Sequence, residues 1–347
     1  MALLFCDGFD HYTTVAAHGL KWSGCGASYT SGTGRTGSAG QPSNPSWINL
    51  GSGITTLIFG CAFNHASNGD TTFFVSDSVT DHVTIKFLGA SGNLLVWTPN
   101  GAATMVRYNT YASGWCVTHA NVPNVVRPAV WNYVEAKVVL HNSTGAVTIK
   151  VNGATISTLT NIDTISATTG GEGTAMSFGM MGFNTTTWFD DLYVCDNSGS
   201  NCNDFLGDVR VVTVLPSDGN GSNTDFTCSS STDHGALVNE STPNDDTDYV
   251  YSSTLNHVDT WNYPALGYTG TIKAVQLNLD AKKTDAGTRA IAGVTRPAST
   301  NRVHGTNHYL AGSYAYWRAI WELNPEDSAA WEVADIDGAE FGVKVTV

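Results

Sequence analysis

Short runs in which apolar and polar residues alternate recur along this chain, and they restrict its fold more than any other feature. Clear examples occupy residues 84–88, 134–140 and 147–151, each bordered by Gly, Asn, Pro or Ser. This two-residue period predicts half-buried β-strands, and the period of amphipathic helices is nearly absent. Strands spaced at intervals of about ten residues, with turn residues between them, indicate a sandwich or a jelly roll. We therefore expect an all-β protein.

The turns support the same fold class. Residues 141–145 (His-Asn-Ser-Thr-Gly) separate two of the alternating runs and predict a hairpin turn. No internal repeat is visible, so a solenoid or a propeller is not supported.

Length and composition predict two folded domains. The chain has 347 residues, of which 13% are charged and 10% aromatic; disordered chains show the opposite balance, and a domain usually takes roughly 150 residues. A stretch of Asp, Asn, Ser and Gly at 196–201 follows an apolar run. We expect a first domain at 1–197 and a second β-sandwich domain at 203–347. Strands are expected in the second half at 207–215, 248–253, 272–282, 287–294, 315–322 and 340–347.

The formal net charge of −14 excludes two classes of partner. Non-specific nucleic-acid binding requires a basic surface, and anionic membranes also attract basic segments. Apolar runs stay far below the ~20 residues of a membrane span, which predicts no membrane insertion. The first residues lack a basic segment and reach Asp7 early, so we expect no signal peptide and synthesis in a cytoplasm.

The seven cysteines show no spacing typical of a zinc site. Cys6, Cys61 and Cys195 lie in apolar runs and are expected to be small buried side chains. Cys195 and Cys202 are close enough in sequence to form a disulfide in an oxidising medium.

Three segments of the first half resemble the concanavalin A-like (laminin G-like) jelly roll. They are residues 131–138, residues 145–153 and residues 189–194, the last containing an Asp pair. The resemblance covers roughly residues 1–197 and implies that the opening strand, 3–9, lies in the same sheet as 189–194.

The same resemblance assigns sides to four side chains of the first of these segments, residues 131–138. Trp131 and Tyr133 are expected to fill the interior of the sandwich, while Glu135 and Lys137 point outward.

Further segments are similar to the lectin-like structural proteins of tailed bacteriophages. They are residues 5–12, 21–22 and 34–37 in the first half, and 205–211, 245–250, 281–283 and 341–344 in the second. The resemblance implies a non-enzymatic virion component of the tail-fibre, appendage or decoration type, made in the host cytoplasm and located in the virion. Its implied partners are other copies of itself and other virion proteins, with a host-surface polysaccharide as a further candidate.

Acidic residues offer the candidate metal and catalytic sites. Asp190 and Asp191 are a candidate calcium pair; the alternative is that they accept hydrogen bonds from loop backbone. No other cofactor is expected. The acidic cluster at 245–248 has no partner carboxylate in a recognisable motif, which favours turn chemistry over a glycosidase. His304 and His308 lie outside any helical pattern and lack the intervening Glu of a zincin. We expect no catalysis.

Aromatic residues are the remaining candidates for binding. Trp97 and Trp115 lie next to loops rich in Gly and Asn and are the candidate glycan-binding residues. Tyr314 and Tyr316 fall in a segment whose alternation sends Trp317 and Trp321 to the opposite side. These two tyrosines are either covered within their own domain or are the anchors of an interface with a neighbouring subunit.

The favoured hypothesis is a structural protein of a phage particle that acts through protein contacts and glycan binding. The alternative is a secreted carbohydrate-binding lectin or adhesin, and a third is an accessory module of a polysaccharide lyase or glycosidase. The absence of a signal peptide favours the first of these.

Overall fold

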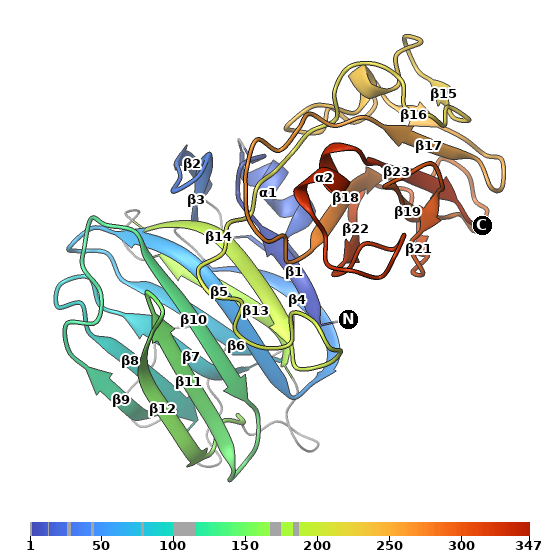
Figure 1. The fold of residues 1–347 in the computed structure, drawn as a ribbon. Helices are drawn as coiled ribbons and strands as arrows, with labels where there is room; N and C mark the ends of the chain where they lie inside the picture. The colour runs from blue at the N-terminus through green and yellow to red at the C-terminus, as the bar shows by residue number, and fades with distance from the viewer. Residues whose placement is uncertain are drawn as a thin grey trace. The chain divides into compact units, whose positions relative to one another are not determined.

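The computed structural model describes residues 2–12, 14–25, 29–42, 45–77, 80–99, 116–166, 175–182 and 187–347. The chain divides into two compact units, Met1–Val212 and Thr213–Val347 (Figure 1). In both units the regular structure is almost entirely antiparallel strand, which confirms the all-β fold class. Within the described part of the chain, no helix combines the length and the apolar composition that a membrane crossing requires.

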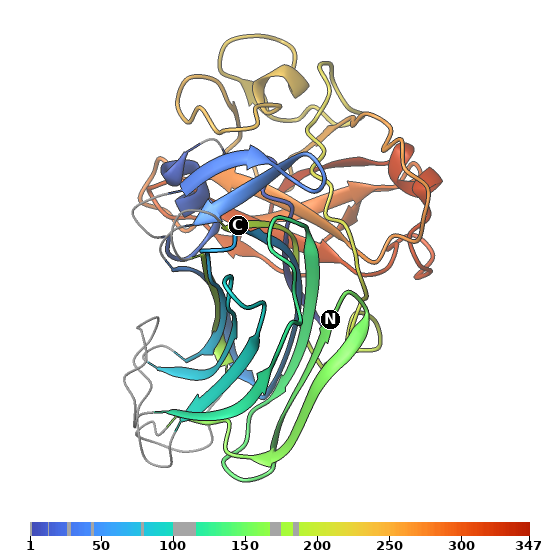
Figure 2. The same ribbon diagram turned by 90° about the vertical axis from the view of Figure 1, so that its left-hand side faces the viewer.

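The first unit consists of two antiparallel sheets stacked as layers (Figure 2). The eight-stranded sheet runs in the order β12 (Ala154–Ile162), β11 (Gly145–Val151), β10 (Asn132–Val139), β5 (Thr56–His65), β14 (Thr187–Asp196), β3 (Ser38–Pro42) and β2 (Tyr29–Thr33), with β1 (Leu3–Asp7) also paired to β14. The six-stranded sheet runs in the order β4 (Ser46–Ile54), β13 (Ala175–Gly182), β6 (Thr71–Ser76), β7 (Asp81–Phe87), β8 (Leu94–Pro99) and β9 (Cys116–Val122). The first unit is therefore a β-sandwich of the jelly-roll type.

Aromatic side chains fill the space between the two sheets. Phe59 and Phe63 project from β5 and meet rings from the other sheet, with centroid distances of 4.7 Å to Phe178 and 5.0 Å to Phe87. All four rings are buried. Each buried ring of this size contributes roughly 1.5–3 kcal/mol, so these four rings are a large part of what holds the two sheets together.

Two pairings predicted from the sequence are confirmed. β1 pairs with β14, with Phe5 opposite Val194, so the two ends of the expected sandwich meet in one sheet. β10 and β11 form the expected hairpin. Its turn is held by His141, whose Nδ1 accepts hydrogen bonds from the N–H groups of Ser143 (3.1 Å) and Thr144 (2.9 Å).

The expected orientation of Tyr133 is wrong. Val134, Ala136 and Val138 face the core, so Tyr133 lies with Glu135 and Lys137 on the opposite face of β10. Both Tyr133 and Glu135 are nevertheless buried. Trp131 precedes the strand, is only partly buried and is not part of the core cluster.

A strap, residues 203–212, covers this outer face of the eight-stranded sheet. The Gly207 N–H donates to Glu135 Oε1 (2.8 Å), and the Leu206 N–H donates to Tyr193 Oη (3.1 Å). Tyr193 Oη–H in turn donates to Glu135 Oε1 at 2.6 Å. Further along, the Val211 N–H donates to a carboxylate of β14, Asp191 Oδ1, at 2.8 Å. These contacts explain why outward-facing residues of β10 are buried.

The strap has irregular backbone, although a strand was expected at 207–215. The N–H groups of Leu206, Gly207 and Val211 bond to side chains instead of to a neighbouring strand, so no ladder forms. The strap also belongs to the first compact unit. The boundary near residue 197 and the independent folding of residues 1–197 remain predictions.

We expect a fragment of residues 1–212 to be more stable than a fragment of residues 1–197. The shorter fragment lacks the donors from Leu206, Gly207 and Val211, and each net hydrogen bond contributes about 1 kcal/mol. Three such bonds give an expected difference in the free energy of unfolding of about 3 kcal/mol. Urea unfolding followed by tryptophan fluorescence measures it, and equal midpoints would contradict a stabilising strap.

The second unit is a smaller β-sandwich with its own core. One sheet has the order β17 (Val258–Trp261), β23 (Glu340–Val345), β19 (Ala290–Arg296) and β20 (Arg302–Val303), with β21 (His308–Tyr309) also on β19. A two-stranded sheet of β18 (Val275–Ala281) and β22 (Ala315–Trp321) packs against it. The packing is close, because a Cβ added at Gly293 would lie 2.5 Å from Ala319 Cβ. Four of the expected strands are thus present as β18, β19, β22 and β23, and the strand expected at 248–253 is present only at Val250–Tyr251.

Two further short strands and a helix complete the second unit. β15 (Thr227–Cys228) and β16 (Val250–Tyr251) form a two-stranded ribbon, and α2 covers Val333–Asp337. The core joins residues from all of these sheets. Its buried members include Trp261, Leu277, Trp321, Trp331 and Phe341.

Candidate functional site

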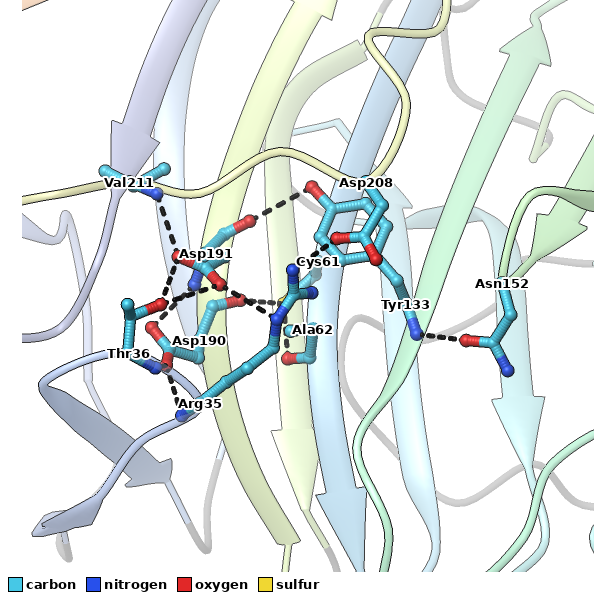
Figure 3. Close-up of polar contacts among 10 residues, drawn as sticks. All are labelled: Arg35, Thr36, Cys61, Ala62, Tyr133, Asn152, Asp190, Asp191, Asp208 and Val211. Atoms are coloured by element: carbon cyan, nitrogen blue, oxygen red, sulfur yellow. Dashed lines mark hydrogen bonds and ion pairs between the residues drawn. The ribbon is translucent and has the colours of Figure 1, made fainter. Parts of the chain in front are cut away.

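The Asp190–Asp191 pair lies at a break in β14 (Figure 3). The pairing of β14 with β5 shifts register between Asp190 and Tyr193, and Asp191 has a φ of +51°. Asp190 Oδ2 accepts hydrogen bonds from the N–H groups of Arg35 (2.7 Å) and Thr36 (3.1 Å), and its Oδ1 accepts one from the Asp191 N–H (2.8 Å). A β-bulge redirects side chains in this way, and here it directs both carboxylates at neighbouring loops.

The guanidinium of Arg35 supplies the positive charge for this pair. Arg35 Nε lies 3.5 Å from Asp191 Oδ2, and Nη2 lies 2.5 Å from Asp208 Oδ1 on the strap. The guanidinium also lies 5.3 Å from the ring centroid of Tyr133. Figure 3 shows these groups converging from four segments of the chain.

Burial and the charge of the neighbouring carboxyl set the protonation of the pair. Burial and then Asp191 raise the pKa of Asp190 to about 8, against the hydrogen bonds from backbone N–H groups. Burial also raises the pKa of Asp191, while the Val211 N–H and Arg35 lower it.

The geometry fits the alternative in which the pair accepts hydrogen bonds from loop backbone. Among the residues that the structure describes, no group of three or more His, Cys, Asp or Glu could hold a metal ion. Calcium binding at Asp190 and Asp191 stays an untested prediction.

A second buried polar centre, around Asp7, was not found by the sequence analysis. Asp7 Oδ2 accepts hydrogen bonds from Tyr12 Oη–H (2.6 Å) and Trp22 Nε1–H (2.8 Å), and Oδ1 accepts one from the Phe9 N–H (2.9 Å). Lys21 Nζ lies 3.4 Å from Oδ1. The short helix α1 (Val15–Lys21) carries Lys21 and Trp22 back to β1. Its seven residues are too few to show helical periodicity, so the sequence did not predict this helix. The only sign of the site in the sequence was the pair of charged residues Asp7 and Lys21.

Two histidines lie beside Asp7. His11 and His18 are both buried, and their rings lie 4.1 and 5.1 Å from the ring of Tyr12. Burial lowers the pKa of His11 to about 4 and that of His18 to about 3, and Asp7 opposes both shifts. The centre is built to hold neutral imidazoles.

Trp97 lies on the outer face of the six-stranded sheet. Leu94 and Val96 fill the core, so alternation along β8 places Leu95 and Trp97 on the other face. Trp97 is half-buried, and its Nε1–H donates to Thr118 Oγ1 at 3.0 Å. Its indole is therefore held in a fixed orientation.

Polar groups surround that indole. Lys86 Nζ lies 5.8 Å from the centroid of Trp97 and 2.9 Å from Asp70 Oδ2. On the edge strand β9, Thr118 and Asn121 are exposed and lie opposite Trp97 and Leu95. We call Asp70, Lys86, Trp97, Thr118 and Asn121 the Trp97 patch. Trp115, its predicted companion, lies outside the described residues.

Tyr314 takes part in a cluster on the surface of the second unit. Its Oη–H donates to Asp246 Oδ1 (3.1 Å), and Lys282 Nζ lies 4.4 Å from its ring centroid and 2.7 Å from Asp246. Tyr316 is partly buried and lies opposite Asp280 on β18. Their role as interface anchors stays a prediction.

The tryptophans of the same segment lie on the opposite side, as expected. Trp321 is part of the core of the second unit, and Trp317 packs against it. His308 stacks on Trp317 with centroids 5.3 Å apart, and His304 Nε2 lies 3.2 Å from the Ile320 carbonyl oxygen. Both histidines thus pack against residues of β22.

Comparison with known proteins gives no family. No protein-family profile matches the sequence, and no curated protein matches it. Similar solved structures include the carbohydrate-binding module CBM66 from Bacillus subtilis, with 11% identity and a TM-score of 0.32, covering 49% of this chain and 92% of that one.

Two further structures with a similar fold are a galectin and a module of a phage protein. Galectin LEC-6 from Caenorhabditis elegans has 11% identity and a TM-score of 0.31, over 44% of this chain and 92% of the galectin. The CBM2 module of the evolved Dit protein of Lactobacillus casei BL23 phage J-1 has 10% identity and a TM-score of 0.34, over 56% and 88%. At these TM-scores the likenesses carry no conclusion about ligand or activity.

Proposed function

We propose that this protein is a non-enzymatic structural component of a tailed-phage particle and that it binds glycans through the Trp97 patch. The observation that carries glycan binding is the indole of Trp97, half-buried on the outer face of its sheet and fixed by its bond to Thr118. A fixed aromatic face suits the C–H face of a sugar ring, because its position costs no further entropy on binding.

The surroundings of Trp97 favour a sugar over other ligands. The patch offers hydroxyl, amide, ammonium and carboxylate groups within one face of the sheet. Sugars present hydroxyls that both donate and accept, and this mixture matches them. A nucleic acid is disfavoured by the net charge of −14.

The resemblance of both halves to virion proteins supports the particle assignment. In this proposal the partners are other copies of the chain and other virion proteins, since virion positions are repeated by symmetry. The particle surface presents the Trp97 patch to a host polysaccharide. A secreted lectin or adhesin is the alternative, and incorporation of the labelled chain into purified particles separates the two.

Trp97→Ala in the full chain is expected to weaken glycan binding at least tenfold. The measurement is retardation in native gels that contain galactan, mannan, xylan or dextran. Trp188→Ala is the matched control, because Trp188 is also half-buried but lies on the other sheet. Equal retardation of both variants, or no retardation of the natural chain by any polysaccharide, contradicts the proposal. Shortening of a polysaccharide during incubation contradicts its non-enzymatic part.

A further inference from the structure

The ribbon of β15 and β16 in the second unit exposes two tyrosines side by side. Tyr249 and Tyr251 are 37% and 51% exposed, and their ring centroids lie 5.9 Å apart at an interplanar angle of 54°. Val250 between them packs against the core. Alternation therefore places both rings on the outward face of the ribbon.

Hydroxyl groups accompany the two rings. Thr227 lies opposite Tyr251, and both Thr227 and Ser229 are exposed. Ser229 Oγ accepts a hydrogen bond from the Tyr249 N–H at 2.9 Å, and the Ser229 N–H donates to the Tyr249 carbonyl oxygen at 3.0 Å. These two bonds extend the pairing of β15 and β16 by one residue, to Ser229 and Tyr249. The backbone that carries both rings is therefore paired.

We infer that this outward face, Thr227, Ser229, Tyr249 and Tyr251, is a second glycan-binding site and that its ligand is a neutral oligosaccharide. None of the four residues is charged, which leaves an ionic ligand without a counter-charge. Two half-exposed tyrosines offer on the order of 200 Å², well below the roughly 800 Å² that a stable protein partner covers on each side. The size, the paired rings and the hydroxyl border fit one or two sugar rings.

The inference extends the glycan-binding proposal to a second position on the same chain. Two sites linked in one chain raise the apparent affinity for a polymer, because the second contact becomes intramolecular. A long polysaccharide can engage both sites, whereas a short oligosaccharide engages one.

The experiment uses the full chain and the same four polysaccharides. Tyr249→Ala/Tyr251→Ala is expected to lose at least tenfold in affinity for a polysaccharide that the natural chain binds. Tyr309→Ala is the control, because Tyr309 is 60% exposed and lies on β21. Tyr251→Trp is expected to retain binding, since it keeps an aromatic face. Melting temperatures are expected to stay within about 2 °C of the natural chain, as for most surface substitutions; if the double variant unfolds, Tyr251→Ala alone provides the test.

The outcomes separate the two glycan sites. Loss in the tyrosine variant with full binding by Trp97→Ala supports the ribbon site and overturns the Trp97 patch. If Trp97→Ala loses binding and Tyr249→Ala/Tyr251→Ala binds fully, the Trp97 patch is supported and the ribbon site is overturned. If Tyr309→Ala weakens binding as much as the tyrosine variant, or the natural chain binds none of the polysaccharides, the ribbon site is wrong.

Discussion

Asp7→Ala is expected to lower the free energy of unfolding of the first unit by about 3–5 kcal/mol, the usual cost of leaving one member of a buried ion pair alone. The side chain of Lys21 is only 2% exposed, and it would lose its carboxylate partner. Tyr12 Oη–H and Trp22 Nε1–H would lose their acceptor at the same time.

The ionised state of Asp7 is part of this expectation. Burial alone raises the pKa of Asp7, but Lys21, His11 and the bonds from Tyr12 and Phe9 outweigh it, and the pKa lies below its usual value. The carboxylate is therefore charged at neutral pH.

Asp204→Ala is the control for Asp7→Ala. Asp204 also pairs with a lysine, Lys137 Nζ at 3.2 Å, but this pair is open to solvent, with 65% of the Asp204 side chain and 32% of the Lys137 side chain exposed. Exposed pairs contribute about 0–1 kcal/mol. Scanning calorimetry of the full chain measures both variants, and similar transitions for the two would refute the buried-pair account.

The second large effect is a dependence of stability on pH that His11 and His18 produce. An unfolded histidine binds a proton near pH 6.5, whereas the folded chain protonates His11 only near pH 4 and His18 near pH 3. Between these values the unfolded state binds more protons, so stability falls as the pH falls. At pH 5 each histidine costs about 2 kcal/mol relative to pH 7 and the pair about 4 kcal/mol.

Asp190 acts in the opposite direction. Its pKa of about 8 means that the folded state binds more protons than the unfolded state below pH 8, which adds stability as the pH falls. In the natural chain, the change in the free energy of unfolding with pH is therefore the sum of the two opposing effects. A comparison between variants removes this difficulty, because Asp190 is common to both.

His11→Phe isolates the contribution of one histidine. The ring of His11 packs on Tyr12 at 4.1 Å, which a phenyl ring can also do. Relative to the natural chain, this variant is expected to lose about 2 kcal/mol less between pH 7 and pH 5. Urea unfolding at the two pH values gives the difference. Identical losses would show that His11 is not held neutral in the folded state.

The strand order of the first unit was predictable where alternation and turn residues coincide. The hairpin of β10 and β11 combines two alternating runs with a polar turn, and it forms as expected. Alternation says which residues share a face, but not what covers that face. The burial of Glu135 was not foreseen for this reason, since the strap that covers it has no period of its own. Tyr133 was misplaced even though alternation puts it on the same face as Glu135.

The polar centres depend on contacts that sequence patterns do not record. Asp7 meets Lys21 across a helix of seven residues, and Asp190 meets Arg35 across 155 positions. The alternative role of Asp190 and Asp191 as acceptors for loop backbone was foreseen from the Asp pair. Its partners were not, because the bulge and the φ of +51° at Asp191 appear only in the fold.

The strap also determines how mechanical load enters the first unit. A pull on the chain beyond Val212 reaches Val211 first, whose N–H is bonded to Asp191 on β14, and then Gly207, bonded to Glu135 on β10. These two strands flank β5 at the middle of the eight-stranded sheet. Tension therefore arrives at the interior of the sheet, where each strand is held on both sides, and does not peel β14 away from its free end.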